Sequence, residues 1–387
     1  MSKVILLGAS GSIGRQTLDV MKKHRDRFSL DAFSVGTKTR FITPILKQFP
    51  EVKFVCIKDK KKANQYKKKY PNVEFYYGDD GLVKLIENSD GDLLVNALVG
   101  FVGFYPTIVA LRLNKKVALA NKESLVVGGE LVNDLLNQGK GKLYPIDSEH
   151  AAISKCLDVR SDDVKRIILT ASGGAFRDLK REELENVKAS DALKHPTWKM
   201  GNKITIDCAT MVNKCFEIIE AHYLFNYPSK MIDVILHKES YVHSMVEYKD
   251  GTYRADISKP DMRNPIKYAL FEKVTDFKTY AANDYHDFGN YTFKEFDINR
   301  YPVVKWAKYV IDHKGTYGAV LNAANEVAVY AYLKDEIPFL MIEFIIEKMM
   351  TTHKSINNPS VEDIINVDKL VRIETQKMIE KWRDNKR

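Results

Sequence analysis

Two carboxylates, a hydroxyl and an imidazole stand side by side in residues 147–150. They are Asp147, Ser148, Glu149 and His150, and they follow residues 142–146, which have the pattern of a short apolar strand. Because strand side chains alternate between faces, we expect Asp147 and Glu149 to point the same way and to share a divalent cation. Hard oxygen ligands favour Mg²⁺ or Mn²⁺ over zinc. On its own, the segment is more typical of a solvated strand end before a helix N-cap, so other residues must decide.

A glycine-rich turn follows the first apolar segment of the chain. Residues 4–8 predict a buried strand, and Gly8, Gly11 and Gly14 then lead into an amphipathic stretch over residues 15–23. The backbone N–H groups of such a turn, together with the N-terminus of the next helix, can bind a pyrophosphate. A strand–helix turn that binds nothing can have the same glycines. The strand–turn–helix context favours a dinucleotide site.

The segment after the next predicted strand, residues 31–35, indicates which dinucleotide. An NAD enzyme usually has an acid at the end of this strand, where it binds the ribose 2′-hydroxyl. This chain instead has two cations and two hydroxyls, in Gly36-Thr37-Lys38-Thr39-Arg40, and Asp31 lies before the strand rather than at its end. Cations and hydroxyls suit a 2′-phosphate, so the sequence predicts NADP.

Composition indicates a globular protein of two or three domains. The chain has 387 residues, a net charge of +9 and four cysteines without C-x-x-C spacing, so we expect a reducing compartment. No segment reaches the roughly 20 apolar residues of a membrane span, and a strand predicted so close to Met1 leaves no room for a signal peptide. The lysine-rich residues 58–69 are typical of a solvated helix face. We expect the positive charge to attract phosphorylated metabolites, and neither nucleic acid nor membrane as a partner.

Alternating strand-like and helical segments predict an α/β fold that begins with a doubly wound parallel sheet. The strands are expected at residues 4–8, 31–35, 53–57, 73–76, 92–97, 116–120 and 142–146. We expect four parts: a Rossmann-like NADP domain over residues 1–147, an α+β catalytic domain with a lid over 148–270, a connector over 271–301 and a helical domain over 302–387. A hairpin is expected near residues 241–257, and helices over 319–333 and 338–350.

Two loops of the predicted catalytic domain could contact a ligand. Residues 170–174 form a small-residue turn that could bind an anion, or be a tight turn without a ligand. Residues 195–201 place Trp198 in a polar segment. This pattern predicts a lid, or else a loop that the tryptophan anchors to the core.

A helix predicted over residues 210–225 carries a third polar cluster. Asn213 and Glu217 stand four residues apart on one helical face, with Lys214 beside them. Such a face is commonly just solvated. It becomes specific only if it lies beside Asp147 and Glu149, where Glu217 would be a third metal carboxylate and Lys214 a phosphate ligand.

Nine motifs resemble those of the 1-deoxy-D-xylulose 5-phosphate reductoisomerase family. They span residues 8–14, 120–124, 145–150, 170–174, 195–201, 209–214, 243–246, 260–263 and 321–326, and so run almost from end to end. The resemblance implies an enzyme of the methylerythritol phosphate route to isoprenoid precursors. Such an enzyme rearranges 1-deoxy-D-xylulose 5-phosphate, by a retro-aldol/aldol sequence or an α-ketol shift, and reduces the branched aldehyde with NADPH to 2-C-methyl-D-erythritol 4-phosphate.

The resemblance also implies a role for individual residues. The metal ligands would be Asp147, Glu149 and Glu217, for Mg²⁺ or Mn²⁺, with Co²⁺ as a further candidate. The catalytic residues would be these three with Lys122 and His195. The substrate would contact Lys122, Ser148, Glu149, Ser172, His195, Trp198, Cys208, Asn213, Lys214 and Glu217. NADPH would contact Ser10, Gly11, Ser12, Ile13, Gly36, Thr37, Lys38, Asn121, Glu123 and Gly201.

Two residues depart from the family's pattern. Cys208 stands where a phosphate-binding serine is usual, and since a thiol is a poorer hydrogen-bond partner we expect a modest loss of phosphate affinity. Glu239 stands where a glutamine is more familiar, with no consequence that the sequence reveals.

Two other classes of protein share parts of the pattern. A dehydrogenase that does not isomerise its substrate would share the N-terminal half, but it would not need a three-carboxylate metal site together with a phosphate pocket. A regulatory NADP-binding module would need neither. The resemblance implies a homodimer, in the bacterial cytoplasm or in an organelle if a transit peptide has been removed.

Overall fold

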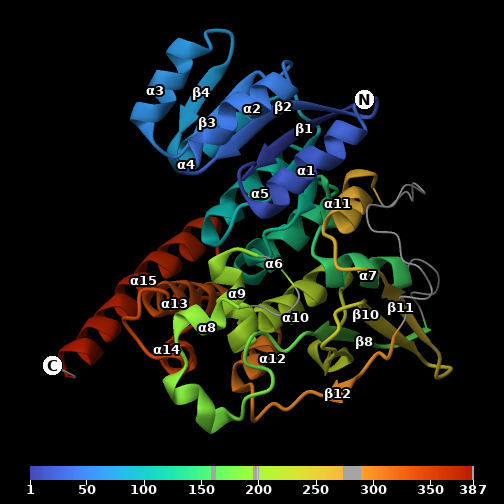
Figure 1. Ribbon diagram of the computed structural model, residues 1–387, viewed down its shortest axis with the longest axis vertical. Helices are drawn as coiled ribbons and strands as arrows, with labels where there is room; N and C mark the ends of the chain where they lie inside the picture. The colour runs from blue at the N-terminus through green and yellow to red at the C-terminus, as the bar shows by residue number, and fades with distance from the viewer. Residues whose placement is uncertain (158–162, 195–197, 199, 273–288, 386–387) are drawn as a thin grey trace. The chain divides into compact units, whose positions relative to one another are not determined.

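The computed structural model describes residues 1–157, 163–194, 198, 200–272 and 289–385. The chain divides into two compact units, which are described separately (Figure 1). The first unit comprises residues 1–124, 131–147 and 261–280, and the second comprises residues 125–130, 148–260 and 281–387.

The first unit is built on a seven-stranded sheet in the order β4-β3-β2-β1-β5-β6-β7. Its strands are β1 (Ser2–Leu7), β2 (Phe28–Val35), β3 (Phe54–Ile57), β4 (Glu74–Tyr77), β5 (Leu93–Asn96), β6 (Lys116–Leu119) and β7 (Lys142–Pro145). Every neighbouring pair is parallel. The predicted α/β fold and its seven strands are confirmed. The strand order reverses between β1 and β5, and ligands of open parallel sheets bind at such a reversal, at the carboxyl ends of the strands.

Helices connect these strands, as the parallel pairing requires. They are α1 (Ser12–Lys23), α2 (Ile42–Gln48), α3 (Lys60–Lys69), α4 (Gly78–Asn88), α5 (Phe104–Arg112) and α6 (Glu123–Asn137). The lysine-rich segment is α3, and the lysines of this helix are exposed as predicted. The helix packs against β4.

The glycines of the first turn allow β1 and α1 to approach closely. Gly8 has a φ of +81°, and a Cβ atom there would lie 2.5 Å from the carbonyl oxygen of Ala97. A Cβ atom at Gly14 would lie 2.3 Å from the carbonyl oxygen of Gly8. The turn therefore requires glycine at both positions, which leaves the N-terminus of α1 close to the strand ends.

The first unit also includes α11 (Arg263–Leu270), which packs against α1. Glu272, just after this helix, accepts a hydrogen bond of 3.0 Å from the Tyr144 hydroxyl on β7 and pairs with Lys116 on β6. These contacts attach α11 to the sheet, whereas the sequence analysis assigned residues 263–270 to the catalytic domain. The finer division at 270/271 and 301/302 stays a prediction.

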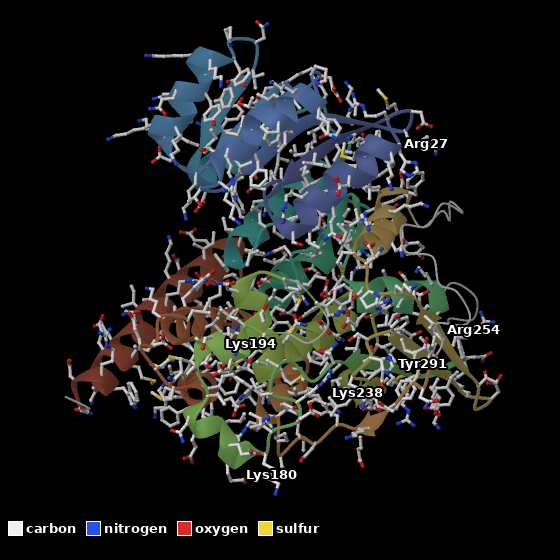
Figure 2. The ribbon with its side chains drawn as sticks, viewed as in Figure 1. Arg27, Lys180, Lys194, Lys238, Arg254 and Tyr291 are labelled. Carbon is white, nitrogen blue, oxygen red and sulfur yellow. The ribbon has the colours of Figure 1, made fainter. Side chains whose placement is uncertain are left out.

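The second unit contains a five-stranded mixed sheet in the order β11-β10-β8-β9-β12. Its strands are β8 (Val164–Ala171), β9 (Ile232–Leu236), β10 (Val242–Tyr248), β11 (Tyr253–Ile257) and β12 (Lys294–Glu295). The antiparallel pair of β10 and β11 confirms the predicted hairpin. β11 is an edge strand, and Arg254 on it is exposed (Figure 2).

Helices make up the rest of the second unit. α7 (Ser148–Leu157), α8 (Ala189–Ala192), α9 (Asn202–Thr210) and α10 (Val212–Phe225) lie in the predicted catalytic part, and α12 (Lys305–His313), α13 (Tyr317–Tyr332), α14 (Phe339–Thr352) and α15 (Val361–Asp384) follow. α13 packs against both α14 and α15, at the orange-to-red end of the chain in Figure 1. The predicted C-terminal helices are confirmed. None of the helices within the described ranges is long and apolar enough to cross a membrane.

One local prediction is wrong. The strand before the acidic cluster ends at Pro145, and Ser148 already begins α7, so Glu149 lies in the first turn of a helix. Strand alternation therefore does not orient Asp147 and Glu149. An acidic residue in the first helical turn is stabilised by the helix dipole, and the alanines at positions 151 and 152 favour helix.

Candidate functional site

Glu149 on α7 and Glu217 on α10 are joined by the ammonium group of Lys214. Lys214 Nζ lies 2.9 Å from Glu149 Oε1, pairs with Glu217 Oε2, and donates to the carbonyl oxygen of Thr170 at 2.5 Å. The Lys214 side chain is 4% exposed. Burial acts to lower the pKa of Lys214, but the charges of Glu149 and Glu217 outweigh burial and raise the pKa above its usual value.

Asp147 adds a carboxylate next to this pair in the chain. It is the last residue of the first unit, and only Ser148 separates it from Glu149. Within the second unit, one carboxylate oxygen of Glu149 lies within 4.8 Å of one of Glu217. Lys122 Nζ lies 2.7 Å from Asp147 Oδ2, and the Ser148 hydroxyl donates to Glu149 Oε2 at 2.6 Å.

The chemistry of this donor set fits Mg²⁺ or Mn²⁺. All three donors are carboxylate oxygens, which hard divalent cations prefer, and neither sulfur nor imidazole is in the group. Negative charges as close as those of Glu149 and Glu217 require compensating positive charge. In this structure Lys214 provides it, and Lys122 pairs with Asp147.

The predicted phosphate residues gather where the turn after β8 meets α9. Gly173 and Gly174 have φ angles of +87° and +68°, and a Cβ atom on Gly174 would lie 2.6 Å from the carbonyl oxygen of Cys208. The turn thus packs directly on α9, and the Gly174 N–H donates to Ser172 Oγ at 3.3 Å. Ser172 and Cys208 are both partly exposed. The structure therefore brings Ser172 close to Cys208.

Asn213 and Lys214 begin the next helix. Met211 adopts a φ of +65°, which ends α9 and separates it from α10. Asn213 Nδ2 donates to Glu217 Oε1 at 2.5 Å. Both predicted phosphate ligands on α10 thus contact a metal carboxylate in this structure.

Only part of the predicted lid can be described. His195, Pro196, Thr197 and Lys199 lie outside the described residues. Trp198 is half-buried, and its ring centroid lies 6.4 Å from that of His243 at an interplanar angle of 52°. Gly201 is exposed and precedes α9.

The predicted cofactor residues of the first unit lie at strand ends. Ser10 and Gly11 form the turn into α1, and Ser12 and Ile13 begin the helix. Gly36, Thr37 and Lys38 follow β2 and are exposed. The Tyr66 hydroxyl on α3 donates to the carbonyl oxygen of Thr39 at 3.0 Å, which supports this loop from the side.

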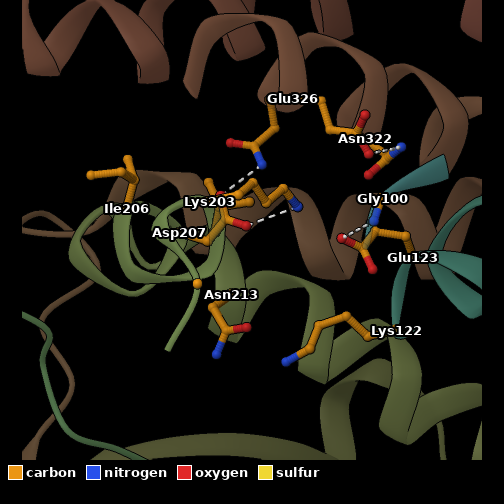
Figure 3. A network of polar contacts seen from close by, with 12 residues as sticks. Gly100, Lys122, Glu123, Lys203, Ile206, Asp207, Asn213, Asn322 and Glu326 are labelled. Atoms are coloured by element: carbon orange, nitrogen blue, oxygen red, sulfur yellow. Dashed lines mark hydrogen bonds and ion pairs between the residues drawn. The ribbon is translucent and has the colours of Figure 1, made fainter. Parts of the chain in front are cut away.

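Asn121 and Glu123 link the loops after β5 and β6. Asn121 Nδ2 donates to the carbonyl oxygen of Gly100 at 2.9 Å and to Glu123 Oε2 at 3.0 Å. Glu123 Oε1 accepts from the Gly100 N–H at 3.1 Å (Figure 3). Both side chains are buried. In this structure they hold the backbone at the edge of the sheet where a dinucleotide is expected.

Sequence reasoning missed two buried polar clusters behind the site. His150 Nε2 lies 2.9 Å from the Glu217 carbonyl oxygen, and His150 Nδ1 lies 3.5 Å from Glu220 Oε2. Lys203 pairs with Asp207 at 2.8 Å on α9 (Figure 3). Asn325 on α13 donates to Asp207 at 2.9 Å. The i, i+4 spacing of Lys203 and Asp207 was a usable signal. The Asn325 contact spans 118 residues and left no local signal.

The Glu239 departure has a structural role. Its carboxylate accepts from the Thr292 hydroxyl at 2.7 Å and lies 3.1 Å from His237 Nδ1. Burial acts to raise the pKa of this carboxyl, but its hydrogen bonds, foremost the one from the Thr292 hydroxyl, outweigh burial and lower the pKa. Glu239 therefore holds the segment before β12 against the turn after β9.

Comparisons with known proteins point to the same enzyme family in each matched part of the chain. Residues 4–129 match a family model described as 1-deoxy-D-xylulose 5-phosphate reductoisomerase, and residues 143–225 and 257–374 match models of C-terminal domains of that enzyme. The chain is 43% identical over 376 residues to 1-deoxy-D-xylulose 5-phosphate reductoisomerase 2 of Bacillus thuringiensis subsp. konkukian, covering 96% of this chain and 98% of that protein. It is 44% identical to the Bacillus subtilis reductoisomerase, with the same coverage.

Solved structures give the same result. A DOX-P reductoisomerase in complex with NADPH, fosmidomycin and magnesium superposes with a TM-score of 0.91 at 32% identity, covering 98% of each chain. The Zymomonas mobilis enzyme in complex with NADPH superposes with a TM-score of 0.89 at 38% identity, covering 98% of this chain and 99% of that one.

Proposed function

The chain belongs to the 1-deoxy-D-xylulose 5-phosphate reductoisomerase family, and we propose that its three-carboxylate cluster holds the divalent ion of that activity. The protein converts 1-deoxy-D-xylulose 5-phosphate to 2-C-methyl-D-erythritol 4-phosphate in the methylerythritol phosphate pathway, and it uses NADPH and a divalent metal ion. The observation that carries the assignment of the site is the approach of Glu149 to Glu217 within 4.8 Å, with Asp147 two residues before Glu149 in the chain. Mg²⁺, Mn²⁺ or Co²⁺ bound there polarises the substrate ketone and acidifies the neighbouring hydroxyl.

The phosphate of the substrate binds at the turn after β8 and the start of α10. Ser172 and Cys208 offer a hydroxyl and a thiol, and Asn213 and Lys214 offer an amide and an ammonium group. His195 is a further phosphate ligand in this proposal. The packing of Gly174 against Cys208 supports a shared pocket for this set.

Lys122 and Ser148 lie beside the reacting carbons. Each contacts a metal carboxylate, Lys122 at Asp147 and Ser148 at Glu149. The ammonium group of Lys122 can stabilise negative charge on a substrate oxygen next to the metal. Trp198 covers the substrate and excludes water from the aldehyde intermediate.

NADPH supplies the hydride that reduces this aldehyde. Its pyrophosphate lies at Ser10, Gly11, Ser12 and Ile13, where the N-terminus of α1 favours negative charge. Its 2′-phosphate lies at Gly36, Thr37 and Lys38. Asn121, Glu123 and Gly201 complete the cofactor contacts in this proposal. We further propose a homodimer in the bacterial cytoplasm, to which the four free thiols are suited.

A coupled assay tests the function. The purified protein should oxidise NADPH when given 1-deoxy-D-xylulose 5-phosphate, and mass spectrometry with NMR should identify the branched product. Chelation of metal should abolish the reaction, and Mg²⁺, Mn²⁺ or Co²⁺ should restore it. An unbranched product, or a rate that chelation leaves unchanged, would exclude the proposed metal-dependent rearrangement.

A further inference from the structure

The ammonium group of Lys214 occupies the space between two of the proposed metal ligands. It contacts Glu149, Glu217 and the carbonyl oxygen of Thr170, and all of these residues belong to the second unit. Lys214 and Glu217 are three residues apart on α10, so one helical turn sets them on the same face.

A lysine in this position competes with a metal ion for the same atoms. An ammonium group uses its N–H bonds to occupy the carboxylate lone pairs that Mg²⁺ needs. It also repels an arriving cation at close range in a buried site. Metal binding therefore requires Lys214 to give up at least one of its carboxylate partners.

The structure offers a nearby place for the displaced ammonium group. Lys214 already contacts the carbonyl oxygen of Thr170, and Ser172 follows two residues later in the turn proposed to bind phosphate. A lysine side chain has four flexible methylene groups, so a rotamer change moves its charge by several ångströms without movement of the helix. The same charge can then pair with a phosphate.

We propose that Lys214 is an internal counter-ion, which neutralises Glu149 and Glu217 when no metal is bound and transfers its charge to the substrate's phosphate when the metal binds. This inference rests on the proposed function, because it takes Glu149 and Glu217 as metal ligands. It makes metal and phosphate binding mutually reinforcing, and thermodynamic linkage requires the coupling to be equal in both directions.

Metal affinity without substrate gives the first test. Lys214→Met removes the competing charge, so Mn²⁺ should bind at least about tenfold more tightly than to the wild type in an electron paramagnetic resonance titration at mildly alkaline pH. Lys203→Met is the matched control, because Lys203 is also buried and paired with a carboxylate, Asp207, outside the cluster. It should leave Mn²⁺ affinity unchanged. Equal or weaker Mn²⁺ binding by Lys214→Met would overturn the proposal.

Inorganic phosphate gives the second test. Calorimetry of the wild-type protein should show tighter phosphate binding with Mg²⁺ than without it, and Lys214→Met should lose most of this enhancement. An enhancement of the same size in the variant would mean that phosphate contacts the metal directly, which contradicts the transfer of charge from Lys214. If Lys214→Met does not fold, Lys214→Gln carries the same expectations, since it also lacks the charge.

The outcomes separate this inference from the proposed function. If the wild type binds no Mn²⁺, or if Glu217→Gln binds Mn²⁺ as tightly as the wild type does, the metal site itself is wrong. If the wild type binds Mn²⁺ through Glu217 but Lys214→Met binds no better, the metal site stands and the counter-ion role is wrong.

Discussion

Glu217 is the residue whose change best separates the metal function from the cofactor function. Its side chain is 1% exposed and contacts both Asn213 and Lys214. Glu217→Gln keeps the shape and removes the charge, so we expect kcat to fall roughly a hundredfold or more while the Kd for NADPH is unchanged. Steady-state kinetics measures kcat, and a fluorescence titration with NADPH measures its Kd. Glu185→Gln, an exposed change in the same unit, is the control. A near-native kcat at limiting Mg²⁺ would show that Glu217 binds no metal.

Cys208 is the residue at which this chain departs from its family in the phosphate pocket. A hydroxyl is a better hydrogen-bond partner than a thiol, so Cys208→Ser should lower the KM for the substrate by about two- to fivefold with little change in kcat. Cys156→Ser, at a buried thiol distant in sequence from the pocket, is the comparison. An unchanged or higher KM in Cys208→Ser would remove this residue from the phosphate site.

The roles of single residues could be proposed from the sequence, but the contacts that their side chains make could be predicted only in part. The closeness of Lys214 to Glu217 follows from helical spacing. The contact of Lys214 with Glu149 joins residues 65 positions apart and depends on how α7 and α10 pack. Sequence reasoning therefore proposed a phosphate ligand at Lys214 but not the ion pairs that this side chain makes without metal.

Helices and strands could be predicted where their burial requires a characteristic pattern of apolar residues. Central strands of a parallel sheet are covered on both faces, and in β1 the four successive residues Val4 to Leu7 are all apolar and buried. The start of α7 was left between two interpretations, because Asp147-Ser148-Glu149 suits both a strand end and a helix start. The break between α9 and α10 depends on the φ of +65° at Met211, a conformation that methionine rarely adopts and that the sequence does not signal.

The loop after β2 should determine the choice between NADPH and NADH. Lys38 and Arg40 are exposed, and the contact of Tyr66 with Thr39 holds their backbone in place. Replacing both cations with methionine should raise the KM for NADPH about tenfold or more and leave the KM for NADH nearly unchanged, because only NADPH carries the 2′-phosphate. The matched control replaces Lys61 and Lys68 on α3, which are also exposed. Equal losses with both cofactors would contradict a 2′-phosphate site.

The lid segment should report substrate through Trp198. The other tryptophans, Trp306 and Trp382, lie on α12 and α15 and should change little. Intrinsic fluorescence should therefore change when substrate is added, and Trp198→Ala should abolish most of this signal and lower kcat/KM, because an open site exposes the aldehyde to water. If Trp198 only anchors its loop, Trp198→Ala would instead lower the Tm, and the fluorescence change on adding substrate would persist.

At the scale of the whole molecule, the sequence predicted the fold class and the family but not the path of the chain between units. Residues 261–272 belong to the first unit, although in the chain they lie between β11 and β12 of the second unit's sheet. Their place in the first unit depends on Glu272 meeting Tyr144 and Lys116, two residues more than a hundred positions earlier in the chain. Local sequence patterns do not reveal such long-range contacts. The motifs that carry the chemistry are short segments of the chain, so they could be recognised from the sequence.

The last prediction concerns a ligand that must satisfy the metal site and the phosphate pocket together. Fosmidomycin carries a hydroxamate, which chelates a metal through two oxygens, and a phosphonate, which resembles the substrate's phosphate. If Asp147, Glu149 and Glu217 hold the metal and Ser172, Cys208 and Asn213 line the pocket, fosmidomycin should raise the Tm by a few degrees with Mg²⁺ and much less after chelation. Glu217→Gln should abolish the Mg²⁺-dependent part of this shift.

Cys208→Ser should increase the Tm shift caused by fosmidomycin, whereas Glu217→Gln should decrease it. A hydroxyl at this position improves the phosphonate contact and leaves the metal ligands untouched, so the Tm shift with Mg²⁺ should increase slightly. The two variants therefore test the two ends of one ligand independently. A shift of equal size with and without metal, or one that neither variant alters, would mean that fosmidomycin binds elsewhere and that the carboxylate cluster and the turn after β8 do not form one substrate site.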